Sequence, residues 1–397
     1  MLCFVPLFNL VGLESSLVMG VVLGLGAMLI TDSALAAGLA AELPTPGRAF
    51  FALLPRNLAL VLPGLALLAA NALRVRNCDP IQGLAFWLLI PTVSIAIGQG
   101  LVWGANLITH HRALRLGLAL SIVALDAGWM IWCLATEPSI MGHSMLLGWF
   151  PGSLYDEAIH VPTALKWYRL LCVGGLGIGV LGMELRWRQR TNREVGPWLV
   201  GLVAVALPWL WIWIGREARG IGLDRADVAK ALGGRVETAH FIIHYDPKKI
   251  DADHVPLLIE DHEYRYAELA AWTGGDPVTW KGRKLQSYVY PDRATQYRLM
   301  GSRRTLVARP WTHEMHIRWE QLGDNLLAHE LAHLFSAPVG AGPLRLATRG
   351  GPMMVDIGMV EGFAYAADWP PSELTAHQAT AAMRRLKMAP DLRAIFT

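Results

Sequence analysis

Two histidines four residues apart, with a glutamate directly after the first, define the segment in which we expect metal chemistry. Asn325–Phe335 reads NLLAHELAHLF and contains His329, Glu330 and His333. Residues four apart share one face of a helix, so both imidazoles can bind a single ion. Glu330 is rotated by about 100° from His329, too far to be a third ligand but close enough to hold a water on that ion. The pattern predicts a zinc ion that lowers the pKa of its water towards ~7, with Glu330 as the general base.

A third ligand separates a catalytic zinc site from a chance match. With 13 histidines in 397 residues, HExxH arises by chance in roughly one or two chains per hundred of this composition. Glu361 is the candidate third ligand. It lies in the helix-compatible segment Met359–Trp369 (MVEGFAYAADW), 28 residues after His333, and the residues between are rich in Gly and Pro, so the chain can turn back. The alternative is an ordinary helix whose histidines face solvent or the core.

HELAH followed by an EGFA-type helix resembles the gluzincin metallopeptidases, the zinc peptidase clan that includes thermolysin and the EGFA-bearing aminopeptidases. The similarity covers Ala239 to about Trp369. It implies a zincin-like fold, with a small mixed sheet on the HExxH helix and an edge strand, within Ala308–Trp319, that pairs with an extended peptide substrate. It also implies His329, His333 and Glu361 as the zinc ligands and Glu330 as the base that polarises water for attack on a peptide carbonyl.

The sequence also departs from these relatives. The gap before Glu361 is longer than theirs, and no GAMEN-like stretch that would recognise a free amino terminus is present, so exopeptidase activity is unsupported. Tyr365, four residues after Glu361, and His316, on the presumed edge strand, are two candidates for stabilising the oxyanion. The structural alternatives are a core tyrosine and an exposed strand histidine. Asp368 is either an outer partner of a ligand histidine or a helix-end carboxylate.

The elements that must position these residues lie in the more polar half of the chain. Hydrophobic residues make up 53% of the sequence and charged residues 17%. Residues 1–214 contain 12 Lys+Arg and 10 Asp+Glu, whereas residues 215–397 contain 23 and 22. The second half has strand-like segments in Ala239–Pro247 and Lys284–Asp292, two short strand candidates broken at Pro310, and a helix after Asp251. The helix that carries HExxH begins at about Asp324, with Asp324 or Asn325 as its N-cap.

The first half contains apolar runs, each near the ~20 residues that a helix needs to cross a bilayer. Tryptophans cluster in or at the ends of these runs, as expected for rings that prefer the membrane interface. We predict six crossings, the fifth the shortest: Leu10–Leu29, Leu58–Leu73, Leu84–Ala105, Leu116–Ala135, Leu170–Met183 and Trp198–Ile214. The predicted fold is therefore a multi-span α-helical membrane region, residues 1–214, followed by an α+β zincin-like metallopeptidase domain, residues 215–397.

Lysine and arginine in short loops decide orientation, because they resist translocation. With the N-terminus outside, eight arginines fall in inner loops and four basic residues, including Arg169, fall in outer loops. This arrangement predicts a multi-pass protein of the plasma or inner membrane with an extracytoplasmic C-terminal domain. The basic residues after the last span argue the other way. Cleavage at Ser33–Gly38 (SALAAG), which resembles a signal-peptidase site, would remove the first span and invert the topology.

The remaining features limit the classes of function. A net charge of +3, with acids interspersed among the basic residues, is too small to indicate a nucleic-acid partner. We expect a peptide or protein substrate and the lipid bilayer as partners, and the sequence does not indicate an oligomeric state. Intramembrane Glu14 and Asp126 keep open a second reading, a transporter or sensor whose polar domain only binds a ligand or protein.

Overall fold

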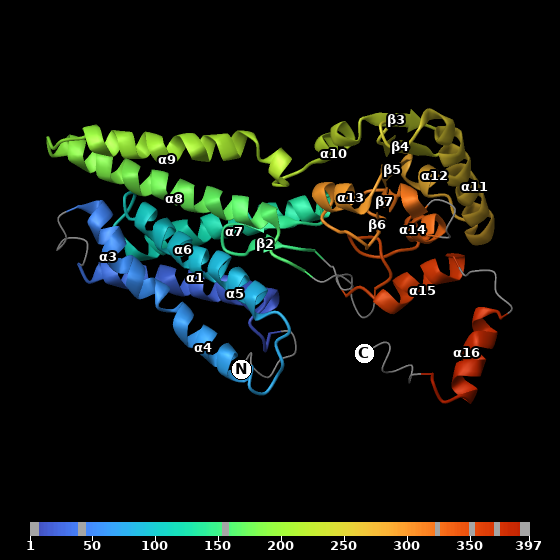
Figure 1. Ribbon diagram of the computed structural model, residues 1–397, viewed down its shortest axis with the longest axis horizontal. Coiled ribbons are helices and arrows are strands. Elements are labelled where there is room, and N and C mark those ends of the chain that lie inside the picture. Colours follow the sequence, from blue (N-terminus) through green and yellow to red (C-terminus); the bar gives the residue numbers. More distant parts are fainter. Residues whose placement is uncertain are drawn as a thin grey trace. The chain divides into compact units, whose positions relative to one another are not determined.

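The computed structural model describes residues 8–38, 45–152, 159–321, 326–348, 354–368 and 374–389. It divides the chain into two compact units, Met1–Asp224 and Arg225–Thr397 (Figure 1). The boundary lies ten residues after the one expected from the change in composition.

In its described residues, the first unit consists of helices and one short hairpin. Its strands β1 and β2 pair in antiparallel orientation, and a 3₁₀ turn, Glu217–Arg219, follows the last helix. The elements are α1 (Leu13–Ala36), α3 (Pro46–Leu58), α4 (Val61–Asn71), α5 (Pro80–Leu89), α6 (Pro91–Ala105), α7 (Arg112–Thr136), β1 (Gly142–Ser144), β2 (Gly148–Phe150), α8 (Thr163–Arg190) and α9 (Gly196–Ile214).

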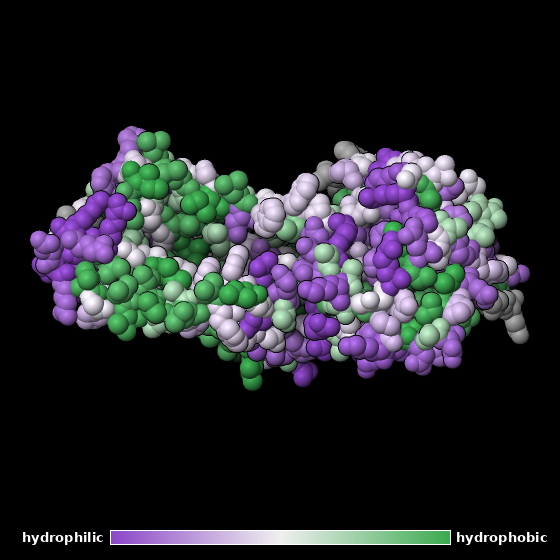
Figure 2. Space-filling model, turned by 90° about the horizontal axis from the view of Figure 1, so that it is seen from above, coloured by the Kyte–Doolittle hydropathy of each residue, from purple (hydrophilic) through white to green (hydrophobic). Residues whose placement is uncertain are grey.

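Six stretches of the described part of this unit are long and apolar enough to cross a membrane, as predicted. They are Leu13–Ala36, Pro46–Asn71, Pro80–Ala105, Arg112–Thr136, Thr163–Arg190 and Gly196–Ile214. The fifth was expected to be the shortest, and this was wrong: it spans 28 residues and is the longest of the six, because polar residues flank its apolar centre within one helix. Figure 2 shows hydrophobic residues over much of the visible surface of this unit, where lipid tails can contact them.

Several buried polar side chains of the first unit pair with one another inside it. Asp32, at the end of α1, is fully buried and pairs with Arg115 of α7, which is almost as buried, and with Arg112. The side-chain amide of Asn57 donates to Thr31 and to Gln99, with donor–acceptor distances of 3.0 and 2.8 Å. Such pairing avoids the high free energy of an unpaired polar group in an apolar medium.

The hairpin between α7 and α8 is held by two charged side chains. Asp126, which the sequence marks as an intramembrane acid, accepts hydrogen bonds from the Ser144 hydroxyl and the Met145 amide. Arg169 was expected in an outer loop, but it lies in α8 and is buried, and its guanidinium donates to the carbonyl oxygens of Met145 and Leu146. These hydrogen bonds give Asp126 a structural role in holding the hairpin.

The second unit combines a five-stranded sheet with helices on both faces. Two 3₁₀ turns, Ala252–His254 and Trp319–Gln321, precede α11 and follow β7. The elements are α10 (Arg225–Leu232), β3 (Gly234–Glu237), β4 (Phe241–Tyr245), α11 (Val255–Thr273), α12 (Pro277–Lys281), β5 (Leu285–Tyr290), α13 (Arg293–Leu299), β6 (Val307–Arg309), β7 (Glu314–Arg318), α14 (Leu326–Phe335), α15 (Ile357–Asp368) and α16 (Ala376–Arg385).

The sheet is mixed, with the strand order β3-β4-β5-β7-β6. The three central strands β4, β5 and β7 are parallel, and the two edge strands β3 and β6 are antiparallel to their neighbours. The strands predicted in Ala239–Pro247 and Lys284–Asp292 are present as β4 and β5, and the two candidates around Pro310 are β6 and β7. The N-cap expected at Asp324 or Asn325 lies outside the described residues.

Successive side chains of the strands point alternately into two hydrophobic cores, one on each face of the sheet. Phe241, Leu285 and Met315 lie on the face that packs against α11 and α14, in a cluster that also contains Leu258 and Leu331. The other face carries the second cluster, in which α10 and α13 cover β5 through Val228, Leu232, Tyr288, Tyr290 and Leu299. Because successive side chains of a strand point to opposite faces, a residue's position in the strand decides which core it joins.

A neutral histidine is built into the first of these cores. His262 of α11 is fully buried, and its Nδ1 lies 2.8 Å from the Leu258 carbonyl oxygen while its Nε2 lies 2.9 Å from the Ser287 hydroxyl. A carbonyl only accepts, so Nδ1 carries the proton and Nε2 accepts from Ser287. Burial lowers the pKa of His262 to about 4, although the hydrogen bond to Leu258 opposes this.

Acidification should therefore destabilise this unit. The folded pKa of His262 lies below its ordinary value of 6.5, so the unfolded state takes up the proton first as pH falls. The stabilisation is complete above pH 6.5 and is lost as pH falls towards about 4, by up to about 3 kcal/mol. Denaturant unfolding of the full chain between pH 7 and 4 should show a shallower decline for His262→Asn than for the wild type. The exposed-histidine variant His377→Asn is the control, and equal slopes for His262→Asn and the wild type would contradict the assignment.

Candidate metal centre

Helix α14 orients the two histidines through the packing of its opposite face. Leu327, Leu331 and Leu334 belong to the core against the sheet. At about 100° per residue, His329 and His333 project from the other side of the helix. The two rings contact each other edge to face, with centroids 5.0 Å apart. Burial of the leucines therefore sets the direction of both imidazoles.

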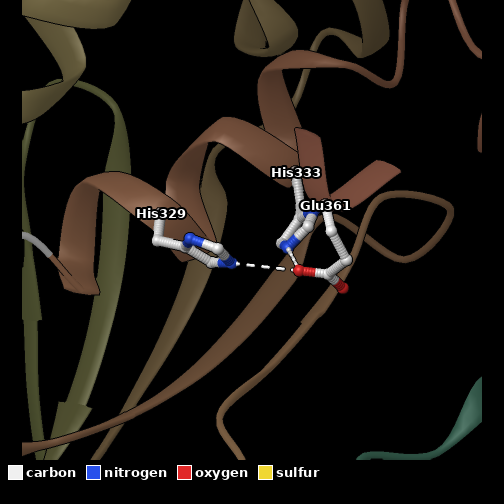
Figure 3. Close-up of side chains that lie close together, drawn as sticks. All are labelled: His329, His333 and Glu361. Atoms are coloured by element: carbon white, nitrogen blue, oxygen red, sulfur yellow. Dashed lines mark ion pairs between the residues drawn. The ribbon is translucent and has the colours of Figure 1, made fainter. Parts of the chain in front are cut away.

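Glu361 reaches the same point from α15. Ala364 anchors this helix, because it is fully buried in the core that α14 also joins. The Glu361 Oε2 atom lies 3.3 Å from Nε2 of His329 and 4.0 Å from Nε2 of His333. Figure 3 shows the carboxylate pointing at both ring nitrogens. The sequence predicted this convergence of two imidazoles and a distant carboxylate.

The three donor groups fit a divalent transition metal. Their ligand atoms all lie within 4.8 Å of one another. Two ligands of a tetrahedral zinc at bond lengths of about 2.0–2.1 Å lie about 3.3 Å apart. The 3.3 Å distance between Nε2 of His329 and Oε2 of Glu361 equals this separation. The ligand atoms of the other two pairs lie farther apart and would have to approach each other by about 1 Å. Two nitrogens and one carboxylate oxygen are also the donor set that zinc accepts while keeping a position open.

The electrostatics of the three groups favour a cation. Burial by itself lowers the pKa of His329, but the hydrogen bond to Glu361 and the charges of Glu330 and Asp368 raise it to about 9. The same hydrogen bond lowers the pKa of the Glu361 carboxyl. Burial lowers the pKa of His333 to about 4, so this imidazole is neutral and has a lone pair to donate. Carboxylates that stabilise a proton on His329 stabilise a divalent cation for the same reason.

Glu330 is buried beside the three donors without belonging to them. Burial raises the pKa of its carboxyl to about 8; His329 opposes this shift, whereas Glu361 and Asp368 add to it. A cation nearby would lower this pKa again. A carboxyl that titrates close to neutral pH can both accept and return a proton.

Two further residues of α15 lie at the centre. Asp368 places Oδ2 2.9 Å from Nδ1 of His329, so the outer nitrogen of this ring is fixed while Nε2 faces Glu361. Tyr365 contacts the His329 ring edge to face with centroids 5.1 Å apart, and 59% of the tyrosine is exposed. It is therefore not the core tyrosine of the alternative reading. Tyr365 and Asp368 follow Glu361 by four and seven residues, a spacing that predicts all three on the same face of α15.

His316 does not reach the metal centre, and its proposed part in oxyanion stabilisation is corrected. It lies on β7, which is an inner strand, and is fully buried rather than exposed. Its neighbours Met315 and Ile317 point towards α14, so His316 points to the opposite face, where its Nδ1 lies 2.9 Å from the Tyr290 hydroxyl. The edge strand expected in Ala308–Trp319 is β6, to which only the first residues of that segment belong.

Comparisons with known proteins add no relative. No protein-family model, no curated protein and no solved structure matches the chain. The metal centre is therefore judged by its own geometry.

The role of Asp368 can be tested by metal affinity. We expect Asp368→Ala to weaken zinc binding by about 10- to 100-fold, because the His329 ring loses the partner that fixes its orientation. A competition titration of the full chain with a zinc chelator measures this. Asp251→Ala, which removes an exposed carboxylate before α11, should bind zinc like the wild type. Equal affinities for the two variants would show that Asp368 is only a helix-end carboxylate.

Proposed function

We propose that the chain is a membrane-anchored zinc metallopeptidase. The observation that carries this proposal is the convergence of the Glu361 carboxylate on His329 and His333, with Glu330 buried beside them. A mixed sheet with an antiparallel edge strand, packed on the helix that carries HExxH, supports a zincin-like fold for the second unit. The six apolar helix stretches of the first unit supply the anchor.

The residues divide the chemistry between them. His329, His333 and Glu361 would hold the zinc, which when bound supplies the Lewis acidity that activates water and polarises the substrate carbonyl. Glu330 would take the proton from the attacking water and deliver it to the leaving amine. Asp368 orients His329 through the 2.9 Å contact at Nδ1. Tyr365, exposed next to His329, would donate a hydrogen bond to the developing oxyanion.

An extended peptide would pair with β6. This strand is hydrogen-bonded to β7 on one side only, within the described residues. The backbone groups of its free side can add a further strand, whatever the side chains of the peptide are. The proposed activity is therefore endopeptidase hydrolysis.

Replacement of the proposed base separates catalysis from metal binding. Glu330→Gln should abolish peptide cleavage, with a loss of at least about 100-fold, and retain one zinc per chain. Glu361→Gln should lower the zinc content instead. The measurements are cleavage of a quenched fluorescent peptide library and elemental analysis of the purified full chain. Cleavage that persists in Glu330→Gln, or a wild-type chain without bound zinc, would refute the proposal.

We further propose that the second unit faces the extracytoplasmic side, on the basis of the eight inner arginines. Arg169 of the opposing set and Arg115 of the inner set are both buried within helices, so seven inner arginines stand against three opposing basic residues. A C-terminal tag should then be digested by protease added to intact spheroplasts. A cytoplasmic loop tag between α8 and α9 should survive, and the reverse pattern would overturn the orientation.

A further inference from the structure

The second unit contains a cationic cluster that includes none of the three proposed metal ligands. It consists of Lys281 at the end of α12, Arg283 just before β5, His313 just before β7, and Arg345 in the connection from α14 to α15. These elements come from three separate parts of the sequence, so the fold gathers the charges. The Trp280 ring contacts three of them, Lys281, His313 and Arg345.

The four side chains are placed by specific contacts. The Lys281 ammonium donates to the Trp311 carbonyl oxygen at 2.8 Å, and the Arg283 guanidinium donates to the Thr312 carbonyl oxygen at 2.7 Å. Both cations therefore flank the turn that leads into His313. The guanidinium carbon of Arg345 lies 4.7 Å from the centre of the Trp280 ring.

His313 is the buried member of this cluster, and its ring has unused hydrogen-bonding capacity. It is 1% exposed, its ring stacks on Trp280 with centroids 5.5 Å apart, and neither ring nitrogen has a hydrogen-bond partner. Buried polar groups without partners are rare, since each raises the free energy of the folded state by the cost of desolvation. The unpaired imidazole indicates that a partner from outside the chain belongs here.

The charge of the cluster is not balanced by nearby acids. Within the described residues, Lys281, Arg283 and Arg345 form no ion pair with a carboxylate. The cations instead act on one another: burial lowers the pKa of Lys281, and so do the charges of Arg283 and Arg345. Like charges this close are held at a cost that an anion between them would relieve.

The backbone supports the same conclusion. His313 and Arg345 have φ angles of 61° and 52°. Left-handed conformations are uncommon for residues other than glycine, although asparagine, aspartate and histidine adopt them more often than other residues, so the constraint is clearest at Arg345. The surrounding structure holds Arg345 in this conformation.

We propose that Lys281, Arg283, His313 and Arg345 form a binding site for a compact oxyanion, a carboxylate or a phosphate group. The two arginines provide planar pairs of N–H donors, which match the geometry of such groups, and Lys281 adds a point charge. A neutral His313 ring would donate one N–H to the anion. The site goes beyond the proposed peptidase activity and does not depend on it.

Binding to the purified full chain in detergent tests the site with two probes. The first is inorganic phosphate, and the second is a blocked tetrapeptide with one glutamate, compared with its glutamine counterpart. The chain carries Glu330→Gln throughout, so the peptide stays intact whether or not the protein is a peptidase. Calorimetry should show saturable binding of at least one anion and at least tenfold weaker binding of the glutamine peptide.

Matched variants decide the result. Lys281→Gln with Arg283→Gln should weaken anion binding at least tenfold, because each charge-assisted hydrogen bond is strong. His313→Asn keeps a residue that tolerates the left-handed backbone and should also weaken binding. Lys230→Gln removes an exposed lysine of α10, which packs on the opposite face of the sheet, and should have no effect.

The two anions identify the source of the bound group. Tighter binding of the glutamate peptide assigns the site to acidic peptides, and tighter binding of phosphate assigns it to a free phosphate. Unchanged zinc content and melting temperature show that the variants are folded. If neither anion binds the parent chain more tightly than the Lys281→Gln/Arg283→Gln variant, the proposal is overturned.

Discussion

Burial of Leu327, Leu331 and Leu334 against the central strands holds the direction of α14, and with it the direction of His329 and His333. A helix can rotate only as a whole, so its apolar face and its histidine face are fixed together. The sheet in turn depends on the alternation of β4, β5 and β7, which supplies Phe241, Leu285 and Met315 to the same core. A packed core is the rigid support that precise positioning of metal ligands requires.

In the first unit the distribution of polar and apolar residues is the reverse of that in a water-soluble domain. Its outward residues are apolar, and polar groups such as Asp32 and Asn57 are paired in its interior. The contact between Asp32 and Arg115 joins α1 to α7, and Asp126 and Arg169 hold the hairpin through backbone groups. Asp126 therefore has a structural explanation that does not require an ion path.

Much of this arrangement could be predicted from local pattern. Long apolar runs identify membrane spans, and alternation identifies β4 and β5, because both signals depend on residues close in sequence. The metal ligands were accessible for a similar reason: the i and i+4 spacing of His329 and His333 and the helix-compatible segment around Glu361 need no knowledge of the tertiary fold.

The features that sequence reasoning missed depend on distant parts of the chain. Strands of three residues, such as β1 and β2, carry too little alternation to be recognised. His316 was misplaced because the edge strand was assigned to the whole segment around it, although the apolar neighbours Met315 and Ile317 indicate the face to which it points. The Asp32–Arg115 pair and the cluster around His313 bring together residues that no spacing rule connects.

Glu361 lies on α15, whereas the two histidines lie on α14. Metal binding would therefore affect how firmly these two helices are held together. A metal bound by His329, His333 and Glu361 would act as a cross-link between α14 and α15, closing the stretch of chain between them. Ejection of the ion would leave α15 attached mainly through Ala364 and its neighbours. Metal binding and the stability of the packing between α14 and α15 are thus thermodynamically linked. Loss of the ion would make the connection between the two helices more accessible to proteases.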